Sequence, residues 1–319
     1  MSYPASLSNR LIVRPGAAPT RVLKEDGNVV LEVALPWLAG PRQEALTACG
    51  PIREEEGFFL TKAGDNLAGI ALAPAGLDSH DAAKLLYAGM LARLNGLALY
   101  RVWNYVPQIN EEVNGLENYR AFNTGRHEAF NAAYGPDFDH RLPAASALGT
   151  QGDRLALCFL AGPAAAKHFE NPEQVPAFRY PVEYGPTPPS FARGTVVSHA
   201  GGQSWYLSGT ASIKGHASLG TGFAEQAGLT FDNVRLMFER MNLPAHAIGS
   251  WKIFLRHRSD LAACQAALSE AFPQAQADAM FLEADICRRS LLLEVEATFQ
   301  QPAFPSIRAG AEQSSALPA

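Results

Sequence analysis

The sequence predicts an α/β (α+β) fold built from two copies of one unit, each with the order β-β-α-β-α-β-β. The chain has 319 residues, which suits two domains of about 100–200 residues each. Hydrophobic residues make up 47% of the chain, enough for a sizeable core in each domain. Segments with strand and helix patterns follow one another in the same order in both halves, and a proline-rich stretch separates the halves.

Composition and charge exclude several classes of protein. The formal net charge is −5, and no run of Lys or Arg occurs, which argues against non-specific binding to nucleic acid or to an anionic membrane. No stretch approaches the ~20 apolar residues of a membrane span, and residues 1–16 contain no apolar signal core. We expect a soluble cytoplasmic protein.

The cysteines and histidines are not spaced as ligands or as a disulfide framework. The four cysteines, Cys49, Cys158, Cys264 and Cys287, lie far apart, with no C-x-x-C pair. The eight histidines form no H-E-x-x-H motif. We therefore expect reduced thiols, no metal and no cofactor.

A proline-rich connector marks the domain boundary. Seven prolines between Pro163 and Pro189 interrupt any helix or central strand, because proline lacks the backbone N–H and has a fixed φ. We predict an N-terminal domain with an additional β-rich segment at its start, an irregular connector, a C-terminal catalytic domain and a flexible tail, spanning 1–162, 163–190, 191–300 and 301–319.

The second half carries the clearer pattern. Apolar residues at helical spacing between Gly222 and Met241 predict a helix, and Asn242 and Pro244 end it. The other predicted elements are a second helix from Ser259 or Asp260 to about Phe272 and strands at 191–198, 205–213, 248–255, 280–286 and 290–299.

The first half repeats this order. Segment 85–107 aligns with 234–256, and segment 152–162 aligns with 287–298. An internal repeat of this length indicates two copies of one unit, whose sheets can pack side by side. The predicted elements are helices at 80–95 and 116–134 and strands at 58–62, 67–73, 97–105, 144–148 and 155–160.

The second half resembles the RidA/YjgF superfamily. The resemblance lies in W-Y-L-S-G-T at 205–210, the helix that contains Asn233, S-W-K-I-F-L at 250–255, L-A-A-C-Q-A-A-L at 261–268 and L-L-L-E-V-E-A at 291–297. It implies that Glu294 is the ligand-site glutamate of the last strand. The family's carboxylate-binding arginine would fall near Ala279, where the sequence has none, and this departure disfavours imine-deaminase chemistry.

The whole chain resembles the chorismatases, a group that includes 3-hydroxybenzoate synthases and chorismate hydrolases of secondary metabolism. The matching segments are 101–107, 119–126, 208–216 and 287–296. The resemblance implies an enzyme that releases pyruvate from chorismate. Cys287 is similar to the residue of hydroxybenzoate-forming members, so we expect 3-hydroxybenzoate, alone or with 4-hydroxybenzoate.

This reaction sets two chemical demands. Chorismate carries two carboxylates, and guanidinium groups suit carboxylates because they bind them bidentately. Cleavage needs a proton on the methylene carbon of the enolpyruvyl ether, followed by attack of the substrate hydroxyl or of water. A carboxylic acid held away from water can supply that proton near neutral pH, because desolvation raises its pKa.

Glu294 is the candidate acid. In the strand 291–299, Leu292, Glu294, Glu296 and Thr298 share one face. Glutamates on an alternating strand usually face solvent, and we expect this of Glu296. The assignment of Glu294 rests on its family position.

The candidate substrate-binding arginines are Arg193 and Arg126. Arg193 begins a strand, where it is either a carboxylate clamp or a surface charge. Arg126 shares a helix face with Phe122 and with Tyr119, which is a further candidate substrate-binding residue, whereas Arg120 points away. Solvent exposure of Arg126 is the alternative.

Four further residues complete the predicted site. Tyr105 either offers its phenol to the substrate or packs in the core, as we expect of Trp103. Gly209 and Ala211 leave room for a ligand beside a strand, although small residues there also permit a bulge. No histidine is linked in sequence to Cys287, so we predict that it shapes the pocket and favours attack by the substrate's own hydroxyl.

Three other functions stay open. A chorismate hydrolase would give 3,4-dihydroxycyclohexa-1,5-dienoate and pyruvate, and a RidA-like imine deaminase would release ammonia from 2-aminoacrylate. A non-catalytic module would bind the metabolite without producing pyruvate. Because RidA-like units commonly form trimers, the resemblance allows a small homo-oligomer, and a fused pair of units also allows a monomer.

Overall fold

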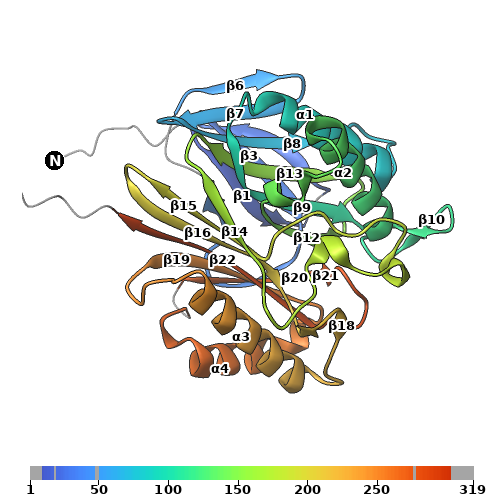
Figure 1. Cartoon of the computed structure of the whole chain (residues 1–319), viewed down its shortest axis with the longest axis vertical. Coiled ribbons are helices and arrows are strands. Elements are labelled where there is room, and N and C mark those ends of the chain that lie inside the picture. Colours follow the sequence, from blue (N-terminus) through green and yellow to red (C-terminus); the bar gives the residue numbers. More distant parts are fainter. Residues whose placement is uncertain (1–8, 18, 47–49, 276–277, 303–319) are drawn as a thin grey trace, which may run out of the picture.

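The computed structural model describes residues 9–17, 19–46, 50–275 and 278–302. Two seven-stranded sheets dominate the molecule, and a pair of helices lies beside each of them (Figure 1). The predicted tail, apart from its first two residues, lies outside the described residues.

The N-terminal unit has the predicted order of elements. It consists of β7 (Phe58–Ala63), β8 (Asn66–Leu72), α1 (Ser79–Arg93), β9 (Ala98–Pro107), α2 (Asn118–Tyr134), β12 (Ala144–Thr150) and β13 (Ala156–Gly162). The sheet has the order β21-β12-β9-β13-β8-β7-β6, in which β6 is Ile52–Glu55. Strands β9 and β12 are parallel, whereas β13 is antiparallel to both of its neighbours.

The C-terminal unit repeats this arrangement. It consists of β15 (Gly194–His199), β16 (Gly202–Thr210), α3 (Phe223–Arg240), β19 (Ile248–Leu255), α4 (Leu261–Ala271), β20 (Ala279–Glu283) and β22 (Leu293–Pro302). Its sheet order, β14-β15-β16-β22-β19-β20-β4, places the five repeated strands as in the first unit, again with one parallel pair. The predicted internal repeat and fold class are confirmed.

The helix boundaries follow local chemistry. The side chain of Asp78 caps α1 by accepting a hydrogen bond from the Asp81 backbone N–H at 2.9 Å. Gly135, at φ 78°, ends α2, and Asn242, at φ 51°, follows α3. Asp260 precedes α4 as predicted, but its side chain makes no capping hydrogen bond.

The β-rich start of the chain forms a third sheet and also extends the second one. The four-stranded sheet β2-β3-β1-β5 contains β1 (Leu11–Gly16), β2 (Arg21–Glu25), β3 (Asn28–Ala34) and β5 (Glu44–Ala45). Strand β4 (Trp37–Ala39) pairs with β20 of the C-terminal unit. Conversely, β21 (Asp285–Ile286) pairs with β12 of the N-terminal unit. Each unit thus supplies an edge strand to the other unit's sheet.

The connector is more regular than predicted. Strand β14 (Ala166–Phe169) pairs antiparallel with β15 and forms the edge of the second sheet. The rest of the connector makes two 3₁₀ turns, Ala177–Arg179 and Val182–Tyr184. Two short hairpins, β10–β11 (Glu112–Val113 and Leu116–Glu117) and β17–β18 (Ile213–Lys214 and Ala217–Ser218), complete the strands. Further 3₁₀ turns are Phe138–Arg141, Arg258–Asp260 and Pro273–Ala275.

The core has three layers of apolar contact. Helices α1 and α2 cover one face of the first sheet, and α3 and α4 cover one face of the second. The inner faces of the two large sheets pack together with the four-stranded sheet, through side chains such as Trp103, Phe254 and Leu282. This arrangement buries the inner face of β22, which carries Glu294 and Glu296.

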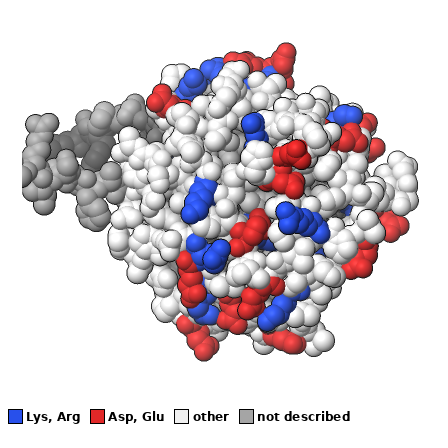
Figure 2. All heavy atoms as spheres, viewed as in Figure 1, with Lys and Arg blue, Asp and Glu red and all other residues white. Residues whose placement is uncertain are grey.

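The face of the molecule seen in Figure 2 carries charges of both signs. In the view of Figure 2, basic and acidic side chains are interspersed. None of the helices in the described ranges combines the length and apolar character needed to cross a bilayer. Cys158, Cys264 and Cys287 are free thiols, and Cys49 lies outside the described residues.

Candidate active site

A cavity of about 400 Å³ lies where both units and the connector meet. Its walls come from α2, β12, the connector, the β16–β17 segment and the loop before β22. This volume lies within the usual range of small-molecule sites, about 300–1,000 Å³. The predicted residues that line it are Glu294, Cys287, Arg193, Arg126, Tyr119, Gly209 and Ala211.

Glu294 reaches the cavity from the inner face of β22 with 4% of its surface exposed. Burial, and after it the charge of the nearby Glu296, raise the pKa of its carboxyl group to about 8, against the lowering effects of Arg101 and Arg193. The protonated form therefore predominates at neutral pH. A carboxylic acid in this state can donate a proton to a bound ligand.

Gly209 makes the room that Glu294 occupies. The pairing between β16 and β22 shifts register between Leu207 and Thr210, so Gly209 lies in an irregular segment of the strand. A Cβ atom at Gly209 would lie 2.0 Å from Glu294 Oε1 and 3.3 Å from Ser146 Oγ. Only glycine leaves space here for the carboxyl group, so the room beside Gly209 is taken by Glu294, and room for a ligand at Gly209 stays a prediction.

Glu296, by contrast, does not face solvent, and that expectation is wrong. It is 1% exposed and accepts hydrogen bonds from Arg101 Nη2 at 2.7 Å and Trp103 Nε1 at 2.9 Å. Lys252 Nζ lies 2.8 Å from Glu296 Oε1, the oxygen that also accepts the hydrogen bond from Trp103. The face of β22 is covered by β9 of the other unit, and sequence alternation alone cannot reveal this packing.

Arg193 is a buried guanidinium at the cavity wall. Its Nη2 donates a hydrogen bond of 2.6 Å to Tyr180 Oη, and its backbone N–H donates one of 3.3 Å to Glu170 Oε1. Burial raises the pKa of Glu170 to about 7, although the charge of Arg193 opposes this shift. The Nε–H of Arg193 has no hydrogen-bond partner among the described residues. The interpretation of Arg193 as a surface charge is wrong.

Arg126 is the second buried guanidinium, with 1% of its surface exposed. Its Nη2 donates to Asn123 Oδ1 at 2.7 Å, and its charge lies 4.8 Å from the ring centre of Phe122. Within the described ranges no carboxylate forms an ion pair with Arg126, and its Nε–H is unpartnered. A buried cation without a counter-ion suits an anionic ligand.

Tyr119 lies in the cavity as predicted, but Tyr105 does not. Burial raises the pKa of the Tyr119 phenol, which stays neutral. Tyr105 packs in the core between the sheets, where β9 pairs it with Leu148 and Ala156. The four-stranded sheet β2-β3-β1-β5 covers this end of β9, so the phenol of Tyr105 does not reach the cavity. The predicted substrate contact of Tyr105 is wrong.

Cys287 borders the cavity on the loop between β21 and β22. Burial and Glu294 raise the pKa of its thiol to about 12, so the thiolate nucleophile is absent at neutral pH. Arg256 fixes this loop by donating hydrogen bonds to the backbone oxygens of Leu291, Ile286 and Arg288 at 2.7, 3.1 and 2.9 Å. A neutral, fixed thiol suits the predicted role of shaping the pocket.

Several cavity residues were not predicted. Tyr180 and Tyr184 come from the connector, where the aromatic and charged run 178–184 is the only signal in the sequence. The guanidinium carbon of Arg288 lies 4.1 Å from the Tyr184 ring centre. Ser146 lines the cavity from β12, and Arg120, predicted to point away, also lines it.

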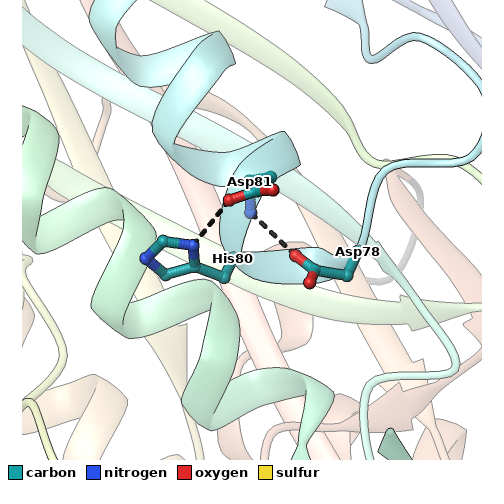
Figure 3. A group of neighbouring side chains, drawn as sticks. All are labelled: Asp78, His80 and Asp81. Atoms are coloured by element: carbon teal, nitrogen blue, oxygen red, sulfur yellow. Dashed lines mark hydrogen bonds and ion pairs between the residues drawn. The ribbon is translucent and has the colours of Figure 1, made fainter. Parts of the chain in front are cut away.

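One group of potential metal ligands lies elsewhere, at the start of α1. Figure 3 shows Asp78, His80 and Asp81 together. Their hydrogen bonds explain the grouping, since Asp78 caps the helix and His80 bonds to Asp81 and to Glu128. Two of the three residues are exposed, and the cluster is separate from the cavity lining.

The fold and site combine two α/β units with a cavity that a buried carboxylic acid and two buried guanidinium groups line. Residues 50–161 match the family model described as "Chorismatase FkbO/Hyg5-like, N-terminal". A chorismatase from Streptomyces rapamycinicus is 33% identical over 79% of this chain and 80% of its own length. The chain belongs to the chorismatase family.

A second curated relative and a solved chorismatase structure agree with this assignment. A 3-hydroxybenzoate synthase from Streptomyces hygroscopicus is 37% identical over 62% of this chain, and the alignment spans 62% of that relative's length. A solved crystal structure of a chorismatase is 26% identical, with a TM-score of 0.80 over 93% of this chain and 95% of that chain. A YjgF/YER057c/UK114 family protein from Mycobacterium tuberculosis aligns with 43% of this chain at 14% identity and a TM-score of 0.33.

Proposed function

We propose that this protein cleaves chorismate into pyruvate and a hydroxybenzoate, with Glu294 as the acid. The observation that carries the proposal is a buried carboxyl group, its pKa raised by burial, in a cavity whose two buried guanidinium groups, Arg126 and Arg193, have N–H donors without a partner among the described residues. Chorismate is a dianion, which suits the two guanidinium groups, and its enol ether is labile to acid, which suits the carboxyl group. The names of the relatives, chorismatase and 3-hydroxybenzoate synthase, support the same substrate.

The arginines bind and orient the substrate. Arg126 and Arg193 each take one substrate carboxylate, because only guanidinium groups offer two parallel N–H donors to it. Phe191 packs near both guanidinium groups, at 5.9 and 5.1 Å from its ring centre, which keeps water from this wall. The dry surroundings strengthen the ionic contacts with the substrate.

Proton transfer starts the cleavage. Glu294 donates its proton to the methylene carbon of the enolpyruvyl group, and the ether oxygen stabilises the resulting cation. The bond between this oxygen and the ring then breaks, its electron pair completing the keto group of pyruvate. The neighbouring hydroxyl oxygen bonds to the ring carbon and gives its proton to the Glu294 carboxylate, which restores the acid.

The arene-oxide-like product of this step opens and loses a ring proton, and the hydroxyl oxygen takes up a proton. The hydroxybenzoate and pyruvate together contain all atoms of chorismate, so the sequence consumes no water. Cys287 favours this route by occupying the space beside Glu294 that water would need. Replacing Cys287 with alanine is expected to raise the share of the non-aromatic dihydrodiol. Unchanged product ratios by chromatography would refute this role.

A direct assay tests the activity. Purified protein is mixed with chorismate, and pyruvate is followed with a coupled dehydrogenase. Pyruvate with an aromatic product supports the proposal, whereas pyruvate with the dihydrodiol identifies a chorismate hydrolase by product mass and absorbance. Binding without pyruvate would identify a non-catalytic module. Imine-deaminase chemistry is disfavoured, because Ala279 lies in the apolar core beside Phe281.

The setting of the reaction is also a proposal. The free thiols of Cys158, Cys264 and Cys287 suit a reducing compartment, which supports action in the cytoplasm. We expect a monomer or a small homo-oligomer such as a trimer. A monomer is favoured because the inner faces of the two units already pack together, and a trimer follows from the resemblance to RidA-like units. Light scattering after gel filtration distinguishes these states.

A further inference from the structure

We propose that Glu296 is a positioning residue for this reaction: its buried, ion-paired carboxylate keeps Glu294 protonated and directed into the cavity. The inference rests on the proposed role of Glu294 as the acid. Glu296 lies two residues further along β22 on the same inner face, and it is not part of the cavity wall. Its effect on the reaction is therefore indirect.

The contacts of Glu296 hold it in the ionised form. Arg101 and Trp103 donate hydrogen bonds to its two oxygens, and Lys252 lies 2.8 Å from one of them. Burial alone would raise the pKa of Glu296, but the two cations and their hydrogen bonds outweigh it and lower the pKa. A permanent negative charge is thus fixed in the protein interior.

The charges around Glu296 balance among themselves. Lys252 Nζ also lies 2.6 Å from Glu44 Oε2, which makes a chain of Glu44, Lys252, Glu296 and Arg101 with two charges of each sign, buried except for the partly exposed Glu44. An ionised Glu294 would find no unpaired cation in this chain and would lie near the charge of Glu296, whereas Arg193, on the cavity side, opposes this effect. The chain therefore disfavours proton loss from Glu294 until the substrate accepts the proton.

Ser146 joins this charged chain to the cavity. Its Oγ accepts a hydrogen bond of 2.6 Å from Arg101 Nη2, the same nitrogen that bonds to Glu296. Ser146 lines the cavity, and its Oγ and Glu294 Oε1 both border the space above Gly209. Arg101 is held between Ser146 and Glu296, so its charge is directed toward Glu296 rather than left free to pair with Glu294.

The other titratable groups around the two glutamates are neutral or fixed. The groups that face Glu294 are Glu296, Arg101, Arg193, Tyr119 and Cys287. The groups that face Glu296 are Arg101, Lys252, Glu44, Ser146, Tyr105 and Cys158. Burial raises the pKa of each of these tyrosines and thiols, so they stay uncharged near neutral pH. Glu170, one step away behind Arg193, is the remaining group with a pKa near neutrality, about 7.

The test compares the pH dependence of kcat/KM for pyruvate release from chorismate. In the wild type, kcat/KM is expected to fall at high pH as Glu294 loses its proton, and this fall is the basic limb of the profile. Glu296→Gln removes the fixed charge while keeping the side-chain shape, so the basic limb is expected to move to lower pH by about one unit or more. Glu296→Asp keeps the charge and is expected to restore the wild-type limb. Glu170→Gln separates the contribution of Glu170 to the same limb.

The matched control is Glu32→Gln. Glu32 is also a buried glutamate in an ion-paired cluster, with Arg14 and Arg21, but it lies in the small sheet. Its loss is expected to lower stability without moving the limb. The inference is overturned if folded Glu296→Gln keeps the wild-type limb, or if Glu32→Gln moves the limb equally.

A measurement on the wild-type protein covers the case in which Glu296→Gln does not fold. With carboxyl-¹³C glutamate, NMR is expected to show one buried carboxylate that stays ionised near neutral pH and a second that titrates at about pH 8. Assignment uses Glu294→Gln. A Glu296 carboxyl that is protonated at neutral pH would refute the inference. Absence of pyruvate from wild-type protein would instead refute the proposed function.

Discussion

Replacing Glu294 with glutamine should change how the stability of the protein depends on pH. The pKa of Glu294 is about 8 in the folded protein, compared with the ordinary value of 4.5. The folded state therefore binds this proton more tightly than the unfolded chain does. The stabilisation is fully present below about pH 4.5 and is lost as the pH rises through about 8. Glutamine cannot ionise, so the variant should lack this dependence.

The magnitude follows from the pKa difference of about 3.5 units, which corresponds to about 5 kcal/mol at roughly 1.4 kcal/mol per unit. Urea unfolding of both proteins at several pH values gives the free energy of unfolding, and the difference between them cancels the other titrating groups. We expect wild type to lose about 1.4 kcal/mol per pH unit relative to the variant across this range. Parallel pH profiles for the two proteins would refute the raised pKa of Glu294.

Three further substitutions probe the cavity. Gly209→Ala should displace the Glu294 carboxyl, because the new Cβ would lie 2.0 Å from its Oε1. The kcat for chorismate should then fall by about 10²-fold or more, the range for losing an acid, and a kcat within twofold of wild type would contradict this. Arg126→Met should raise KM for chorismate about tenfold or more, because a charged hydrogen bond contributes roughly 1.5–3 kcal/mol, and an unchanged KM would exclude the contact. Arg256→Met should loosen the loop that carries Cys287 and increase the dihydrodiol share by chromatography, while an unchanged product ratio would show that the loop is held without Arg256.

The regular parts of the fold could be predicted from local patterns. Helix α3 and strand β19 match the predicted bounds closely, because apolar spacing and the stop at Asn242 are encoded within one segment. The repeat of strand order in both units also follows from aligned segments. The edge strand β4 could not be predicted, since three residues carry no period and its partner lies in the other unit. Strand β21 falls within the strand predicted at 280–286, but the break after Glu283 and the pairing with β12 of the other unit could not be predicted.

The same limit applies to the site. Alternation placed Glu294 and Glu296 on one face of β22, yet it could not show that this face is covered. Arg101 and Glu296 are 195 positions apart in the chain, and only the packing of one sheet on the other brings them together. Tyr105 illustrates the opposite error, because its suitable chemistry said nothing about the small sheet that covers it.

The exchange of β4 and β21 between the two sheets has a consequence for how the chain attains its structure. A fragment that ends within the connector would leave β12 without its outer neighbour, and the complementary fragment would leave the outer edge of β20 unpaired. Unpaired strand edges promote association with other chains. Separately produced halves are therefore expected to associate through these edges, which the single polypeptide covers with its own strands.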